Sequence, residues 1–169
     1  MIIVSDTTPL HYLIVIERAE LLAELFGSII IPEAVFAEMA HDKTPVIVQE
    51  WLTALPSWVQ VKGASPSISA QVKNLGRGET EAIALALEHH ADALLMDDRK
   101  AIREARKNNL VVLTTLAILE LAAIKGLIDF PEVLHELAQT NFRLPSDEIV
   151  EAFLRRDQAR KQLSDKTTD

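Results

Sequence analysis

The stretch Met1-Ile2-Ile3-Val4-Ser5-Asp6 gives the first indication of the fold. It is a short, apolar, β-branched run of the kind that forms a buried strand in a parallel sheet, and it ends in a carboxylate. A second run of this kind, Ala93-Leu94-Leu95-Met96, ends in Asp97-Asp98. Because an ionised carboxylate loses hydration when it is buried, acids placed directly after buried strands need a structural or functional explanation.

Strand-like and helix-like segments alternate along most of the chain. The expected strands are 1–5, 29–31, 58–61, 93–96 and 111–113, and the expected helices between them are 10–26, 32–39, 46–55, 79–90 and 101–108. This alternation predicts a mainly parallel sheet with helices on both faces, a three-layer α/β/α sandwich. Further helices are expected at 116–125, 131–139 and 146–162. We therefore expect one domain over 1–163, with a helical extension from about 131 and a frayed tail at 164–169.

The composition fits one globular domain: 169 residues, of which 49% are apolar and 25% charged. No apolar run reaches the roughly 18 residues of a membrane span, and no basic segment precedes the apolar N-terminal stretch. The expectation is therefore a cytoplasmic protein without a membrane segment. The chain has no cysteine, which excludes disulfides and thiolate metal ligands.

The net charge of −8 argues against a protein that binds nucleic acid indiscriminately, because such binding normally depends on Lys and Arg. Basic residues nevertheless gather in two places. One cluster follows Asp98 and the other lies near the C-terminus; they comprise Arg99, Lys100, Arg103, Arg106 and Lys107, and Arg155, Arg156, Arg160 and Lys161. A basic run of this kind is most often a solvated helix face.

The acids at the strand ends are expected to share one edge of the sheet. In a parallel sheet, ligands bind beyond the carboxyl ends of the strands, where Asp6 and Asp97 or Asp98 are placed. Glu79 follows Gly76-Arg77-Gly78 at the start of a helix and falls on its inward face, whereas Glu81 shares a face with Glu88 and is expected to point to water.

Oxygen ligands without cysteine or a tight histidine cluster suit Mg²⁺ or Mn²⁺. A pair of such ions can activate water and hold the leaving oxygen during phosphodiester cleavage. Thr7, and Thr114 or Thr115 at the end of the last strand, are candidates to position a water or a phosphate oxygen.

Each acid also has an ordinary structural explanation. Asp6 alone fits a helix N-cap, and Glu79 alone fits a first-turn helix acid. Glu38 alone fits an exposed helix residue, and Asp97-Asp98 fits a turn. The functional hypothesis therefore depends on the joint placement of these acids, because several carboxylates that converge on one point require a neutralising cation.

Four segments together resemble the motifs of the PIN-domain family of nucleases, and in particular the VapC-type toxin ribonucleases of toxin–antitoxin pairs. They are Ile3-Val4-Ser5-Asp6-Thr7-Thr8-Pro9-Leu10, Ile31-Pro32-Glu33-Ala34-Val35-Phe36-Ala37-Glu38, Leu75-Gly76-Arg77-Gly78-Glu79-Thr80-Glu81-Ala82 and Leu94-Leu95-Met96-Asp97-Asp98-Arg99-Lys100-Ala101. Their order and rough spacing agree with the family, and the resemblance covers nearly the whole chain.

The resemblance implies a PIN-like fold and an endoribonuclease that depends on Mg²⁺ or Mn²⁺. The implied catalytic residues are Asp6, Glu38, Glu79 and Asp98, with Asp97 as the alternative to Asp98 and Glu81 as the alternative to Glu79. Arg99 and Arg103 are expected to steer the RNA backbone. The implied partners are an RNA substrate, a small cognate antitoxin and a second copy of the chain. The rival hypothesis is a weakly active or inactive binding module of the same fold.

Overall fold

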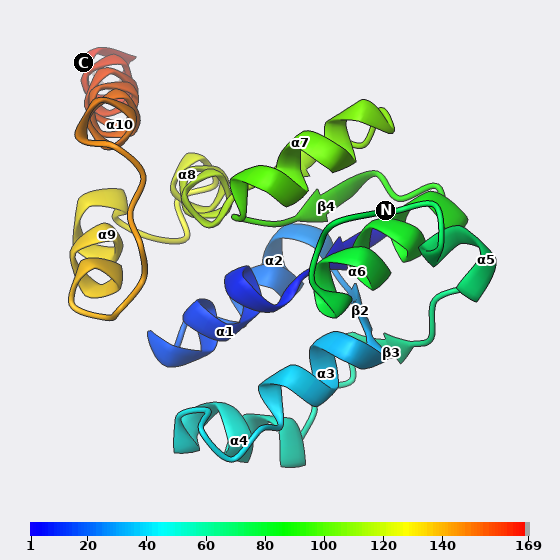
Figure 1. The fold of residues 1–169 in the computed structure, drawn as a ribbon. Helices are drawn as coiled ribbons and strands as arrows, with labels where there is room; N and C mark the ends of the chain where they lie inside the picture. The colour runs from blue at the N-terminus through cyan, green and yellow to red at the C-terminus, as the bar shows by residue number, and fades with distance from the viewer. Residues whose placement is uncertain (168–169) are drawn as a thin grey trace. The chain divides into compact units, whose positions relative to one another are not determined.

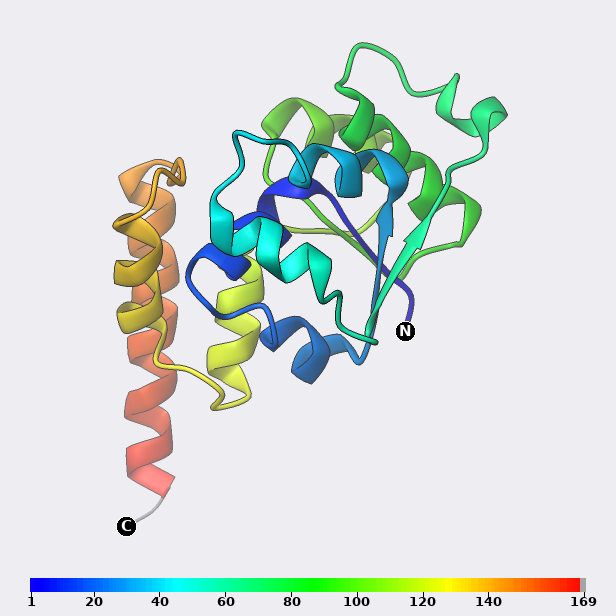
Figure 2. The ribbon, with the colours of Figure 1, turned by 90° about the horizontal axis from the view of Figure 1, so that it is seen from below.

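The computed structural model describes residues 1–167, with side chains as far as Ser164. The chain divides into two compact units, Met1–Thr115 and a second unit that begins at Leu116. Figures 1 and 2 show the ribbon in two views, and the two units are described separately below.

The first unit is built on a five-stranded sheet in which every neighbouring pair of strands is parallel. The strand order is β3-β2-β1-β4-β5. The strands are β1 (Ile3–Ser5), β2 (Ile29–Pro32), β3 (Val59–Lys62), β4 (Ala93–Leu95) and β5 (Val112–Leu113). The three inner strands are fully buried, as their continuous apolar sequences predict. The α/β fold class with a parallel central sheet is confirmed.

Helices flank this sheet and carry the chain from one strand to the next. They are α1 (Thr7–Val15), α2 (Leu21–Phe26), α3 (Glu33–Met39), α4 (Val46–Thr53), α5 (Pro66–Ser69), α6 (Arg77–Glu88) and α7 (Arg99–Lys107). The alanine-rich helix α6 contacts β1, β2 and β4, because its small side chains let it approach the sheet closely (Figure 1).

Two segments differ from the sequence prediction. The single helix expected over 10–26 is two helices, α1 and α2, because Glu17 adopts a left-handed conformation with φ of 56° and ends the first helix. The loop expected over 63–74 contains the short helix α5, which begins with Pro66 in its first turn.

The path of the chain creates a switch point at the carboxyl edge of the sheet. From the central strand β1 the chain moves outward through β2 and β3, and then returns to the other side of β1 to form β4 and β5. Open α/β sheets bind ligands at such a point, in the crevice beyond the strands where the direction reverses. Asp6 follows β1 and Asp97 follows β4, so these two acids flank the switch point.

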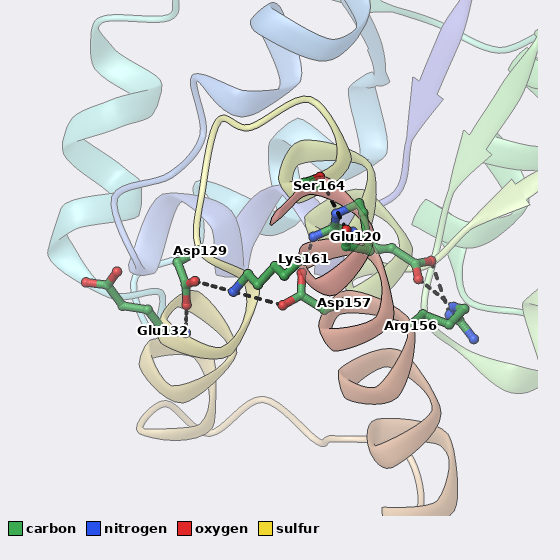
Figure 3. A network of polar contacts seen from close by, with 8 residues as sticks. Glu120, Asp129, Glu132, Arg156, Asp157, Lys161 and Ser164 are labelled. Atoms are coloured by element: carbon green, nitrogen blue, oxygen red, sulfur yellow. Dashed lines mark hydrogen bonds and ion pairs between the residues drawn. The ribbon is translucent and has the colours of Figure 1, made fainter. Parts of the chain in front are cut away.

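The second unit is helical. After α8 (Thr115–Ile124), which begins at the end of the first unit, come α9 (Phe130–Ala138) and α10 (Asp147–Thr167). The rings of Phe130 and Phe153 stack with their centroids 5.9 Å apart. Charged side chains of the three helices form a network of ion pairs and hydrogen bonds (Figure 3).

The last helix is longer than expected. The sequence predicts a helix over 146–162 and a frayed tail over 164–169, whereas α10 continues to Thr167. Residues 168 and 169 lie outside the described part of the chain. Over the described residues, every helix is too short or too polar to cross a bilayer.

Candidate active site

Asp6 lies at the carboxyl end of the central strand and is almost completely buried. Its backbone N–H donates a hydrogen bond to the carbonyl oxygen of Leu95 at 2.9 Å, which extends the pairing of β1 with β4. The residue is only 4% exposed, and its side chain makes no hydrogen bond that would cap α1. The helix-cap explanation of Asp6 therefore does not describe its side chain.

Burial raises the pKa of Asp6 to about 7. A hydrogen bond from the backbone N–H of Thr7 opposes this change, and the negative charges of Glu79, Glu38 and Asp97 increase it further. These three acids come from α6, α3 and the end of β4. The structure therefore brings together acids that are far apart in the sequence, and it does so at the edge that the sequence pattern indicates.

Glu38 is held by two donors from neighbouring elements. The hydroxyl of Thr7 donates to its Oε2 at 2.6 Å, and the backbone N–H of Gly78 donates to its Oε1 at 3.1 Å. A Cβ atom on Gly78 would lie 2.7 Å from both carboxylate oxygens of Glu38. Gly78 therefore permits the close approach of α6 to this carboxylate. Thr7, which the sequence predicts to position substrate, donates its hydroxyl to Glu38 in the structure.

Glu79 and Glu81, which the sequence left as alternatives, have different partners. Glu79 accepts a hydrogen bond from the backbone N–H of Gly76 at 2.9 Å and contributes to the raised pKa of Asp6. Glu81 accepts from the backbone N–H of Ala34 at 3.1 Å and from Nε of Arg77 at 2.9 Å.

The Glu81 side chain is only 16% exposed, so the expectation that it points to water is wrong. The reason is that the face of α6 that carries Glu81 lies against the first turn of α3. The backbone N–H groups of that turn have no partner within the helix, and Glu81 accepts one of them. Glu79 is the glutamate of this pair that belongs to the acid cluster.

Asp97 and Asp98 are adjacent in sequence but serve different purposes. Asp97 accepts hydrogen bonds from the backbone N–H of Thr115 at 2.9 Å and from its hydroxyl at 2.6 Å. Burial raises the pKa of Asp97, and these two hydrogen bonds partly offset that effect. The geometry thus assigns Thr115 a role in positioning Asp97, which the sequence did not indicate.

Asp98 is exposed, and its Oδ1 accepts from the backbone N–H groups of Lys100 and Ala101, each at 2.8 Å, as the N-cap of α7. The sequence ranked Asp98 ahead of Asp97 as a metal ligand; in the structure Asp97 lies with the acid cluster around Asp6, and Asp98 caps α7. Of the other predicted site residues, Thr114 is half-buried beside Thr115, and Arg99 and Arg103 are exposed on α7.

The donor set fits a hard divalent cation. It consists of the carboxylates of Asp6, Glu38, Glu79 and Asp97, and oxygen ligands of this kind suit Mg²⁺ or Mn²⁺. Among the described residues no three Asp, Glu or His side chains are arranged to share one ion; Glu38, Glu79 and Asp97 are paired with N–H or O–H donors. Burial of Asp6, together with the negative charges of the neighbouring acids, raises its pKa and is the reason to expect a cation there.

Comparison with known proteins identifies the family. A family model described as a PIN domain, DUF3368, matches residues 2–158. Among solved structures, a PilT N-terminus domain protein from the archaeon Sulfolobus solfataricus P2 is similar, with 15% sequence identity and a TM-score of 0.44 over 86% of this chain and 100% of that chain. No curated protein matches the chain significantly.

PIN domains are typically nucleases that use divalent metals. The family model spans almost the whole chain, including all four segments that carry the clustered acids. The chain belongs to the PIN-domain family.

Proposed function

We propose that this protein is a divalent-metal-dependent endoribonuclease that hydrolyses phosphodiester bonds in RNA. The observation that carries the proposal is the buried carboxyl of Asp6, whose pKa is raised to about 7 among the charges of Glu38, Glu79 and Asp97. Folding concentrates negative charge at this point at a cost in stability, which is characteristic of a functional site rather than a structural one.

The four clustered carboxylates would hold Mg²⁺ or Mn²⁺. When bound, such an ion supplies activation of water and neutralisation of the charge on the phosphate and the leaving oxygen. The surrounding residues keep the carboxylates in place: Thr7 and Gly78 bind Glu38, and Thr115 binds Asp97. Arg99 and Arg103 on the exposed side of α7 would attract the RNA backbone.

Cleavage of a structured RNA by the purified protein tests this proposal, in Mg²⁺, in Mn²⁺ and with a chelator. We expect Asp6→Asn to lower cleavage by roughly 10²–10⁴, equivalent to several kcal/mol of transition-state stabilisation, because it removes the central carboxylate. Asp42→Asn, which changes an exposed acid, serves as the matched control and should cleave normally. Equal cleavage by wild type and Asp6→Asn would refute the proposal.

The proposal extends to a role as the toxin of a toxin–antitoxin pair, inhibited by a small cognate protein and acting as a homodimer in the cytoplasm. The order of the four motifs and membership of the PIN-domain family support this extension. Co-expression with the product of a short adjacent gene should suppress cleavage, and light scattering should give twice the mass of the chain. Cleavage that no neighbouring gene product inhibits would remove the toxin–antitoxin role and leave the nuclease.

One observation favours the rival function, an inactive or weakly active binding module. Three of the four acids, Glu38, Glu79 and Asp97, accept hydrogen bonds from N–H or O–H donors, as carboxylates with a structural role do. If the rival is correct, neither Mg²⁺ nor Mn²⁺ will support cleavage, and Asp6→Asn will bind its protein partner as tightly as the wild type does.

A further inference from the structure

Helix α7 concentrates positive charge in a chain that is acidic overall. Its nine residues contain five cations and one acid, Glu104, so its formal charge is +5 − 1 = +4. The whole chain carries −8, so the remaining residues carry −12. A charge distribution this uneven produces a local positive potential that the net charge conceals.

The cations of α7 form one continuous exposed face. At about 100° per residue, they fall within an arc of about 120°. The opposite side of the helix is formed by the buried residues Ala101 and Ala105, where α7 packs against β5 and α6. All five cations are exposed; they are Arg99, Lys100, Arg103, Arg106 and Lys107.

The two basic clusters of the sequence differ in how their charges are used. In the cluster near the C-terminus, each of the four cations has an acidic partner. Arg156 pairs with Glu120, and Lys161 pairs with Asp129 and Asp157 (Figure 3). Arg155 pairs with Glu151, and Arg160 pairs with Asp157. In α7 only Lys107 is paired, with Glu104 at 3.2 Å. Within the described part of the chain the other four cations of α7 have no acidic partner. Their charge is available to a ligand.

The stability of α7 explains Arg106 and Lys107, which lie in its last turn where a cation favours the helix dipole, but it does not explain the other cations. Arg99 and Lys100 occupy its first turn, which contains no acid, and a cation there opposes the helix dipole. The backbone N–H groups of Lys100 and Ala101 are already bonded to Asp98. An anion at this end of α7 would therefore contact the side chains of Arg99 and Lys100, because these two backbone N–H groups already have a partner.

We propose that the exposed face of α7, formed by Arg99, Lys100, Arg103 and Arg106, binds the sugar–phosphate backbone of the RNA. This inference rests on the proposed nuclease function and extends it by naming the surface that holds the substrate. Helix α7 begins two residues after Asp97, so a strand with one phosphate at the acid cluster can continue along this face. Contacts with phosphates carry no sequence information, so the surface contributes affinity and register but not sequence preference.

The test measures binding of a fluorescently labelled single-stranded RNA as a function of salt concentration. All proteins carry Asp6→Asn, which keeps the RNA intact if the proposed function holds. The test protein adds Arg99→Gln, Arg103→Gln and Arg106→Gln. The matched control instead adds Lys125→Gln, Arg143→Gln and Arg155→Gln, three exposed cations outside α7 with the same total charge change.

We expect the α7 variant to lose at least about tenfold in affinity, and the slope of log K against log salt to decrease by roughly 2, about 0.7 for each lost phosphate contact. The control should keep both the affinity and the slope. Replacing the same three arginines of α7 by lysine should restore most of the binding, because the charge is retained. Circular dichroism and thermal melting check that every variant is folded.

Three results would overturn the inference. The first is an α7 variant that binds RNA as tightly as the Asp6→Asn parent, and the second is an equal loss of affinity in the control variant. The third is no RNA binding by the parent, which is the result expected if this face binds an acidic protein. Failure of the proposed function gives a different result. In that case RNA cleavage does not differ between the wild type and Asp6→Asn, whatever effect the α7 substitutions have on RNA binding.

Discussion

Gly78 determines where the carboxylate of Glu38 lies, and this makes it the most sensitive glycine near the site. Replacing it with alanine would place a Cβ atom 2.7 Å from both carboxylate oxygens, so the flexible Glu38 side chain must move away. Because alanine favours a helix over glycine by about 1 kcal/mol, the melting temperature should stay constant or rise. We expect RNA cleavage to fall by about tenfold, equivalent to about 1.4 kcal/mol, measured as kcat/KM.

Gly76→Ala is the control for this prediction. Its Cβ would lie 3.5 Å from Oε2 of Glu79, which is an ordinary contact, and its φ of −64° suits any residue. Cleavage should therefore change little. If Gly78→Ala and Gly76→Ala had the same activity, the position of Glu38 would not matter to the reaction.

Asp97 and Asp98 give a second prediction about single residues. Asp97→Asn should lower cleavage by roughly 10²–10⁴, because it removes one of the carboxylates clustered around Asp6 that would hold the metal. Asp98→Ala should instead cost about 1 kcal/mol of stability through loss of the cap on α7, with cleavage largely retained. Steady-state cleavage and urea unfolding of both variants distinguish the two roles, and the reverse pattern would restore Asp98 as the functional acid.

The sequence predicts which segments supply the acids but not always which acid of a pair. Asp6 and Glu79 follow from strand ends and helix faces, which are local patterns. The choice between Asp97 and Asp98 depends on Thr115, 18 residues away, whose N–H and hydroxyl both bind Asp97. Glu81 binds the backbone of Ala34, 47 residues away. Contacts of this range cannot be derived from helical periodicity.

At the level of secondary-structure elements, Glu81 connects α6 to the start of α3. Its carboxylate accepts the backbone N–H of Ala34 and also binds Arg77. Glu81→Ala leaves that half-buried donor of α3 without its partner, so we expect a loss of about 1–2 kcal/mol in the free energy of unfolding. Urea denaturation measures this loss.

The same pair of helices separates the structural from the functional glutamate. Glu79→Ala should lose far more activity than stability, and Glu81→Ala the opposite. Because α3 also carries Glu38, some loss of cleavage is expected in Glu81→Ala. A variant of Glu81 that is fully stable but inactive would show that Glu81, not Glu79, belongs to the acid cluster.

The elements themselves were largely predictable, because buried parallel strands and amphipathic helices follow from short-range patterns. The sheet of five parallel strands was expected from the alternation of segments, and only the strand order required the structure. The helix expected over 10–26 is interrupted at Glu17, whose left-handed backbone lets the N–H of Arg18 bond back to the carbonyl oxygen of Leu13 at 2.7 Å and close α1. The helical periodicity of the apolar residues continues across the break.

For the whole molecule, the acid cluster predicts how the stability of the metal-free protein depends on pH. The pKa of Asp6 is 3.8 in an unfolded chain and about 7 in the folded protein. Between these values the unfolded state has lost the proton that the folded state retains. Raising the pH therefore favours unfolding, by up to about 4 kcal/mol in total, and the loss levels off above pH 7. Burial also raises the pKa of Asp97, which acts in the same direction.

Urea unfolding of wild type and Asp6→Asn at pH 5 and pH 8, with a chelator and with Mn²⁺, isolates this effect. Other groups titrate in both proteins, so the difference between them reports on Asp6. At pH 8 without metal, Asp6→Asn should be the more stable protein by a few kcal/mol; with Mn²⁺ the wild type should gain stability and the variant much less. If the two proteins instead show parallel stability curves under all conditions, Asp6 carries no electrostatic strain, and the main argument for a cation at this edge of the sheet is lost.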